Sequence, residues 1–199
     1  MNNLEDMAHY FHSGVCVTPK RGDLLISEPF LPDPNFERTV VLMCENNEDG
    51  SIGFILNKPS LVNLGDVFED LDNFNKKLLV GGPVQQDSMH FIHRSLSTVD
   101  GGTRIGEGIF WGGNFEKLRI LMQENRVDPA DVLYFLGYSG WAPGQLDEEL
   151  RENSWIVSPA ATAAQVFDLD PELLWQEVLK NMGGKYRMFS NYPTDPRLN

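Results

Sequence analysis

Ser139, in the segment GYSGW at residues 137–141, is the first candidate for a catalytic nucleophile because it lies between glycines after an apolar run. A nucleophile elbow requires a glycine two residues after the serine, and here that residue is Trp141. The hydrolases that use this elbow also place their histidine after the serine, and no histidine follows His93. We therefore interpret Ser139 as a turn serine that hydrogen-bonds to nearby backbone, and we predict no catalytic residue.

The four histidines form two H-x-x-H pairs, His9 with His12 and His90 with His93. Side chains three residues apart on a strand point to opposite faces, so His90 and His93 cannot share a metal ion if MHFIHR is a strand. His9 and His12 could share one face of a helix, but no carboxylate or cysteine stands at a spacing that completes a site. Neither a P-loop nor a dinucleotide-binding glycine motif is present. The sequence therefore predicts neither a metal site nor a cofactor.

The net charge of −13, from 16 basic and 29 acidic residues, disfavours nucleic acid as a direct partner. Affinity for nucleic acid comes mainly from Lys and Arg that displace counterions from phosphates. Direct DNA binding is therefore not expected. The partner is expected to be a small molecule or a protein, and the oligomeric state stays open.

The two cysteines, Cys16 and Cys44, lie in or beside apolar runs and are expected to be buried thiols, with a disulfide as the alternative. The first residues, MNNLEDMAHYFHSG, lack the basic and apolar regions of a secretory signal. No stretch approaches the length of about 18 apolar residues that a membrane helix needs. We expect a cytoplasmic protein without a membrane segment.

A β-hairpin over residues 39–56 is the clearest local prediction. The nearly all-apolar run TVVLMCE predicts a strand that is buried on both faces. NNEDG supplies the turn, SIGFIL is the returning strand, and NKPS is expected to close the hairpin. A further strand is expected at 22–27, followed by a proline-rich excursion at 28–36 that can form neither helix nor central strand.

The remaining segments are predicted strands and helices that neither alternate strictly nor separate cleanly, which predicts an α+β or an irregular α/β fold. Asn114 and Asp170 are expected helix N-caps, and Pro171 occupies a first helical position. Helices are expected at 63–71, 114–125, 144–153 and 170–184. Strands are expected at 77–82, 103–113, 132–136 and 154–159, with an edge strand at 89–94.

Several strands end in glycine or polar residues, in GFILNKP, LLVGGPV and YFLGYSGW. If these ends converge, they line a crevice of the kind where α/β proteins often bind ligands. GYSGWAPGQL is then expected to be a turn that leaves the strand at Gly137 and borders the crevice. The candidate ligand-binding residues are Asn57, Lys58, Gly82, Tyr138, Trp141 and Gln145.

Four motifs in this order, GDLLISEPFLPDPNFERTVVLMCEN, GSIGFILNKP, LLVGGPVQ and GYSGWAPGQLDEEL, closely resemble the YqgE/AlgH family of bacterial proteins. The resemblance covers roughly residues 19 to 158. It implies an α+β fold in which a bifurcated, mixed β-sheet curls into a pseudo-barrel flanked by helices. It also implies a cytosolic protein from a family often described as transcriptional regulators, without an established activity. Ser88 departs from the family pattern, which commonly has arginine there.

Residues 1–18 are interpreted as an N-terminal extension and residues 19–199 as one α+β domain with room for a smaller inserted lobe. Two functional hypotheses follow. The first is a non-enzymatic protein that binds a ligand or a partner in the crevice and acts as a regulator. The alternative is a hydrolase or another enzyme with a small-molecule substrate, using Asp33, Arg38, Lys58 or Asp87.

Overall fold

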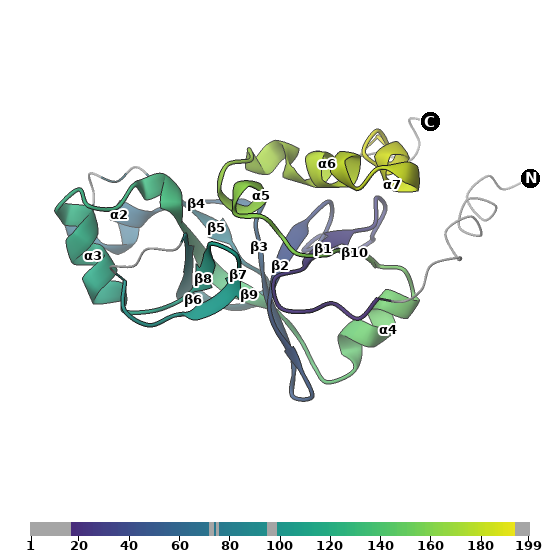
Figure 1. Ribbon diagram of the computed structural model, residues 1–199, viewed down its shortest axis with the longest axis horizontal. Coiled ribbons are helices and arrows are strands. Elements are labelled where there is room, and N and C mark those ends of the chain that lie inside the picture. The colour runs from purple at the N-terminus through teal and green to yellow at the C-terminus, as the bar shows by residue number, and fades with distance from the viewer. Residues whose placement is uncertain (1–16, 72–73, 75, 95–98, 194–199) are drawn as a thin grey trace, which may run out of the picture.

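The computed structural model describes residues 17–71, 74, 76–94 and 99–193. Within them the chain forms a mixed α+β fold (Figure 1). The strands are β1 (Leu24–Ser27), β2 (Val40–Asn47), β3 (Gly50–Ile55), β4 (Pro59–Asn63), β5 (Lys77–Val80), β6 (Val84–His93), β7 (Thr103–Gly106), β8 (Ile109–Trp111), β9 (Val132–Trp141) and β10 (Trp155–Ser158). The α-helices are α2 (Leu64–Val67), α3 (Phe115–Gln123), α4 (Gln145–Arg151), α5 (Ala163–Phe167), α6 (Pro171–Met182) and α7 (Gly184–Phe189), and two short 3₁₀ helices cover Glu69–Leu71 and Pro129–Asp131.

The sheet is bifurcated at β9. Its main path runs β10-β1-β2-β3-β9-β6-β8-β7, and β5, which also pairs with β4, joins the sheet through β9. β3 pairs with the last three residues of β9, whereas β5 pairs in parallel with Phe135 and Leu136. All other pairs are antiparallel. The expected mixed, bifurcated sheet is therefore confirmed, and it stays open rather than closing into a barrel.

Helices cover the sheet in three places, and each place has its own apolar cluster (Figure 1). α6 and α7 lie over one face of β1, β2 and β10, α4 contributes to a cluster on the other face, and α2 and α3 pack at the far end of β5, β6 and β9. β9 supplies side chains to all three clusters, with Phe135 in the first, Tyr134 in the second and Trp141 in the third. The strand that carries GYSGW is thus the centre of the fold.

The predicted hairpin is confirmed, and so is the burial of both its faces. Leu42 and Cys44 of β2 point into the first cluster, whereas Val41 and Met43 point into the third. This is the alternation that a strand between two apolar layers requires. Cys44 is a free, buried thiol, and desolvation raises its pKa. Cys16 lies outside the described residues.

The predicted helices near 114 and 170 are also confirmed, together with their caps. Asn114 accepts a hydrogen bond from the backbone N–H of Lys117, and Asp170 accepts one from that of Glu172. Each satisfies an amide that the helix itself leaves unpaired. None of the helices in the described part of the chain combines the length and the apolar character that crossing a bilayer requires.

Three local predictions are wrong. GYSGW is not a turn: β9 continues through it to Trp141, and the chain turns at residues 142–144. MHFIHR is not an edge strand, because β6 lies between β9 and β8. NKPS does not merely close the hairpin, since Pro59 begins β4. In addition, the helix expected at 63–71 is a single turn followed by a 3₁₀ turn.

Gly137 explains why GYSGW resembles a turn although it is part of a strand. Its φ of +65° is left-handed, and a Cβ there would lie 2.5 Å from the carbonyl oxygen of Val84. The irregularity breaks the two-residue alternation, so that Phe135 and Tyr138 both pack on the first cluster. Composition alone does not distinguish a glycine within an irregular strand from a glycine that ends a strand.

Candidate functional site

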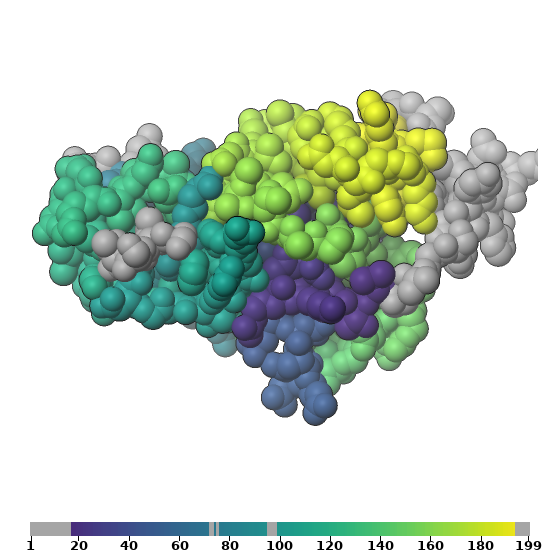
Figure 2. All heavy atoms as spheres, viewed as in Figure 1, coloured from purple at the N-terminus to yellow at the C-terminus, as the bar shows by residue number. Residues whose placement is uncertain are grey.

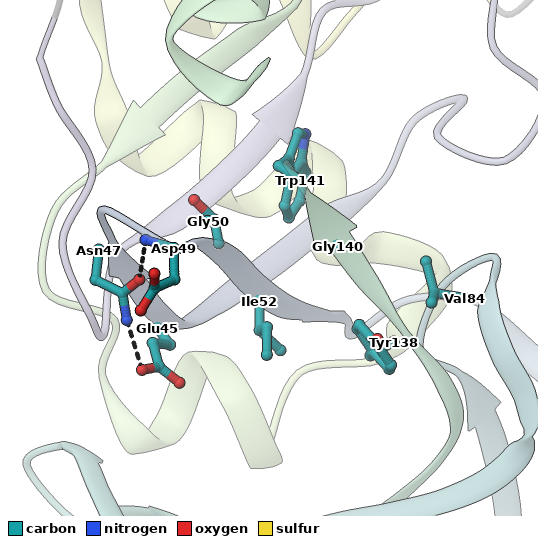
Figure 3. Close-up of a pocket in the computed structure, with 10 residues that line it drawn as sticks. Glu45, Asn47, Asp49, Gly50, Ile52, Val84, Tyr138, Gly140 and Trp141 are labelled. Atoms are coloured by element: carbon teal, nitrogen blue, oxygen red, sulfur yellow. Dashed lines mark hydrogen bonds between the residues drawn. The ribbon is translucent and has the colours of Figure 1, made fainter. Parts of the chain in front are cut away.

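A pocket of about 410 Å³ lies between the tip of the β2–β3 hairpin and the end of β9 (Figure 3). Figure 2 shows the hairpin projecting from the body of the molecule near α4. The hairpin and β9 are hydrogen-bonded neighbours through Ser51, Ile52 and Gly53. The lining residues are Glu45, Asn47, Asp49, Gly50, Ser51, Ile52, Val84, Tyr138, Gly140 and Trp141.

The polar side of the pocket is the hairpin tip, whose side chains hold one another in place. Asn47 Nδ2 donates to Glu45 Oε1 at 2.7 Å, and the Asp49 backbone N–H donates to Asn47 Oδ1 at 2.8 Å (Figure 3). Asn46 Oδ1 accepts from Ser51 Oγ at 2.7 Å. Two carboxylates therefore face the pocket from an ordered turn, and the described residues that line it include no lysine or arginine.

The apolar side of the pocket centres on the half-buried ring of Tyr138. The ring lies against the backbone at Gly140, where a Cβ would come within 3.0 Å of Tyr138 Cε2. It also meets the imidazole of His90 edge-on, with 5.8 Å between ring centroids. Tyr138 and Ile52 project to one side of the hairpin, and Trp141 projects to the other (Figure 3). Gly140 is thus needed for the ring to lie flat on the strand.

Trp141 lines the pocket with its edge but belongs mainly to the core. It is 5% exposed and packs with Phe36 and Trp155, at centroid distances of 6.2 and 5.9 Å. Its indole Nε1–H donates to Glu149 Oε2 at 2.8 Å, and that of Trp155 donates to the same oxygen at 2.7 Å. The predictions that Trp141 is buried, that its N–H finds an acceptor and that Trp155 shares its patch are confirmed.

Gln145, at the start of α4, completes this corner. Its side-chain oxygen accepts from the backbone N–H of Ala142 at 3.0 Å, and its Nε2 donates to Glu149 Oε1 at 2.9 Å. The amide therefore holds the turn at residues 142–144 and orients Glu149. Gln145 borders the pocket through Trp141 without lining it.

Gly82 packs directly against the backbone of Tyr138, and only glycine fits at this position. A Cβ at Gly82 would lie 2.2 Å from the carbonyl carbon of Tyr138. The close approach lets Ser139 Oγ donate to the carbonyl of Gly81 at 3.0 Å. Ser139 is fully buried and does bond to backbone, but the prediction of a turn serine with a local partner is wrong, because Ser139 lies within β9 and its partner belongs to a neighbouring segment.

Asn57 and Lys58 lie beyond the other end of β3 from the pocket and hold the loop 33–38. Asn57 Oδ1 accepts from the backbone N–H of Val40, and its Nδ2 donates to the carbonyl of Arg38, both at 2.8 Å. Lys58 Nζ donates to the carbonyls of Pro34 and Asn35 at 2.7 Å. Burial lowers the pKa of Lys58, against the opposing effect of the nearby carboxylates. The predicted crevice residues therefore do not form one site.

The four candidate catalytic residues do not converge on the pocket either. Asp33 accepts a hydrogen bond within its own loop, from the backbone N–H of Asn35. Arg38 and Lys58 already donate to backbone carbonyls, and Asp87 is exposed on β6. Among the described residues, no group of three His, Cys, Asp or Glu side chains is placed to hold a metal ion. His9 and His12 lie outside the described residues.

Glu45, Asp49, Ile52 and Val84 were not anticipated as pocket residues. NNEDG was interpreted as a turn, which it is, but the sequence does not show what lies beside a turn. The sequence shows a carboxylate-rich turn and an aromatic strand end. That these two segments pair in the sheet is a tertiary property, which no local pattern reports.

Comparison with known proteins decides the family. The family model described as AlgH-like (DUF179) matches residues 24–187. The chain belongs to the AlgH-like family. A UPF0301 protein of Cytophaga hutchinsonii is 44% identical over 180 residues, covering 90% of this chain and 98% of that protein. A UPF0301 protein of Chlorobaculum tepidum is 42% identical, with coverages of 90% and 96%.

Two solved structures have the same fold. The solution structure of the AlgH protein from Pseudomonas aeruginosa has a TM-score of 0.68 and 29% identity, covering 91% of this chain and 98% of that one. The crystal structure of protein DIP2367 from Corynebacterium diphtheriae has a TM-score of 0.76 and 23% identity, with coverages of 92% and 97%. The expected YqgE/AlgH membership is thereby confirmed.

In this AlgH-like chain, Ser88 and His90 form a hydroxyl–imidazole contact of 3.1 Å on β6. Ser88 Oγ, however, donates its single hydrogen to the carbonyl of Gln85 at 2.7 Å, so it accepts from the imidazole. A catalytic serine donates to its histidine instead. We therefore expect a fluorophosphonate probe to leave the protein unlabelled, as measured by intact mass. Stoichiometric labelling lost in Ser139→Ala or in Ser88→Ala would contradict this interpretation.

The partly buried imidazole of His90 should make the stability of the protein depend on pH. Desolvation lowers its pKa below the ordinary 6.5, where the ring packs 5.2 Å from Phe54. The unfolded chain therefore binds a proton first as the pH falls, and stability is lost from about pH 6.5 downward until the folded pKa is passed. Chemical unfolding at pH 7.5 and 5.5 should show a larger loss for the parent than for His90→Phe. Equal losses would show that His90 does not contribute.

Proposed function

We propose that this AlgH-like protein is a non-enzymatic binding protein with a regulatory role, and that its ligand site is the pocket between the β2–β3 hairpin and β9. The ligand group is a cation, carried by a small molecule or by a lysine or arginine of a partner protein. We place this activity in the cytoplasm, a reducing compartment that suits the free thiol of Cys44.

The observation that carries the proposal is the pairing of two carboxylates with one aromatic ring around the same cavity. Glu45 and Asp49 supply negative charge at the hairpin tip, and Tyr138 supplies a π-face on the strand. A cation over such a ring gains roughly 0.5–1 kcal/mol at exposed sites and more when it is desolvated. A charged hydrogen bond to a carboxylate adds roughly 1.5–3 kcal/mol.

Charge also supports this choice of ligand over an anion. The chain carries a net charge of −13, so a positively charged ligand is attracted from a distance and an anionic one is repelled. The hydrogen bond from Asn47 keeps the Glu45 carboxylate in place before binding, which lowers the entropy cost of association.

Native mass spectrometry of protein purified gently from its own cells tests the proposal. The parent should retain an additional mass that Glu45→Gln and Tyr138→Ala release. Glu107→Gln is the matched control, because Glu107 is exposed outside the pocket and the substitution removes the same charge. An additional mass retained equally by all four proteins would place the ligand elsewhere.

The same electrostatics predict weak binding to duplex DNA. At physiological salt, we expect a gel shift to show a dissociation constant weaker than about 1 μM without sequence preference, since non-specific binding depends on clustered cations. A submicromolar complex that survives competition by unrelated duplex would contradict the proposed mode of regulation.

A further inference from the structure

Arg38 is held in a backbone conformation that few residues other than glycine adopt. Its φ is +48°, in the left-handed region. The side chain of Asn57 fixes this conformation from both sides, by donating to the carbonyl of Arg38 and accepting from the N–H of Val40. Strain of this kind persists where surrounding contacts enforce it, and it is common at ligand sites. Here it directs the guanidinium between α6 and the C-terminal segment.

The guanidinium of Arg38 is bound on one nitrogen and left without a partner on another. Nη2 donates to the carbonyls of Tyr192 and Pro193, both at 2.6 Å. The group lies 4.7 Å above the ring of Trp175. Nε is buried and has no hydrogen-bond acceptor among the described residues. Two neutral oxygens therefore share one nitrogen, while the adjacent N–H is unused.

The unused N–H belongs to the edge on which arginine binds anions. The Nε–H and one Nη2–H point in the same direction, and a carboxylate or phosphate accepts from both through two oxygens. A buried charged donor without an acceptor is costly. None of the described carboxylates forms an ion pair with Arg38. The side-on edge of this group therefore lacks the partner for which its geometry is suited.

We propose that Arg38 is the centre of a second binding site, for a carboxylate or phosphate group, and that the segment Ser190–Pro193 covers this site. The anion would replace the carbonyls of Tyr192 and Pro193 on Nη2 and add the missing acceptor for Nε. Trp175 would remain beneath the guanidinium plane. This site lies at the Val40 end of β2, whereas the proposed cation pocket lies at the Asn47 end.

The part of the cover that contacts Arg38, Tyr192 and Pro193, is the part that an anion would displace. Tyr192 stacks on Phe30 at 5.7 Å and contacts Phe189 at the same centroid distance. Its N–H donates to the carbonyl of Phe189 at 3.0 Å. Ser190 and Asn191 are also tied to α7 by backbone hydrogen bonds to the carbonyls of Tyr186 and Met188, so the end of the segment that Arg38 holds is Tyr192 and Pro193. Because the covered and open states compete, the apparent affinity for an anion depends on how easily Tyr192 is released.

Side-chain NMR of the full chain, titrated with inorganic phosphate and separately with acetate, tests this site. We expect a saturable shift of the Arg38 Nε–H resonance, assigned by its loss in Arg38→Lys. Arg21 is the matched internal control, since its Nε already donates to the carbonyl of Cys44 at 3.0 Å, and its resonance should not move. Saturation by phosphate alone would identify a phosphate ligand, and saturation by both would identify a general anion site.

Tyr192→Ala separates a ligand site from a structural anchor. Loss of the two ring contacts should release the cover and tighten phosphate binding by roughly 3–10-fold. Two results would overturn the proposal: an Arg38 Nε–H resonance that does not respond in the parent or in Tyr192→Ala, or one that shifts no more than that of Arg21. Either result would show that Arg38 only anchors the C-terminal segment.

Discussion

Replacing Trp141 with alanine should lower the free energy of unfolding by about 3–5 kcal/mol, as large-to-small changes at buried aromatic residues do. The ring is 5% exposed, packs between Phe36 and Trp155, and joins β9 to α4 through Glu149. Its removal leaves a cavity in the third cluster and leaves Trp155 as the only described indole that donates to Glu149 Oε2. Denaturant unfolding followed by far-UV circular dichroism measures the loss.

Two variants divide this loss into packing and hydrogen bonding. Trp141→Phe retains much of the ring and loses the N–H, so it should cost distinctly less than Trp141→Ala. Gln145→Ala removes only exposed hydrogen bonds to Ala142 and Glu149 and should cost about 1 kcal/mol. If Trp141→Ala were as stable as the parent, the ring would be exposed in solution and part of the binding surface.

Replacing Val41 with aspartate should cost about 4 kcal/mol or more, a large part of the roughly 5–15 kcal/mol by which an ordinary domain is stable. Val41 is fully buried in the third cluster, and a Cβ at Gly53 would lie only 2.6 Å from its Cγ1. The buried residues of the described chain include no lysine or arginine that would pair with the new charge. Thermal unfolding of the purified variant, or its recovery in the soluble fraction, measures the effect.

Leu61→Asp is the matched control for Val41→Asp, because it introduces the same charge on a strand at a side chain that is 96% exposed. It should change stability by less than about 0.5 kcal/mol. Amide hydrogen exchange provides an independent check, since the amides of β2 should be among the slowest. Fast exchange there, or equal costs for the two substitutions, would show that the hairpin is not core.

The sequence predicts those elements whose signals are local. The run VVLMC identifies a strand buried on both faces, and Asn114 and Asp170 mark helix starts through bonds made within four residues. Pro171 marks the same start as Asp170 through its fixed φ. β9 was predicted to end too early because Gly137 looks like a terminator, whereas its positive φ accommodates the close approach of Val84. That contact joins residues 53 positions apart, and no local pattern reports it.

Only part of the candidate site was predicted, because local signals are visible in the sequence and contacts between distant segments are not. Tyr138 and Trp141 were expected at the site because they are large aromatic residues at a strand end, and both line the pocket. Asn57 and Lys58 were grouped with them by chemistry, but their hydrogen bonds go to the loop 33–38. Glu45 and Asp49 were overlooked because they line a pocket only when β3 pairs with β9, and the sequence does not show this pairing.

A titration of the uniformly ¹⁵N-labelled protein with arginine amide, with acetate as the anionic comparison, tests the cation pocket most directly. We expect saturable shifts confined to residues 45–52 and 138–141, with no response there to acetate. Glu45→Gln should weaken binding by roughly tenfold, since a charged hydrogen bond contributes about 1.5 kcal/mol, and Glu107→Gln should leave it unchanged. Shifts that are absent, spread over the surface, or unaffected by Glu45→Gln would contradict it.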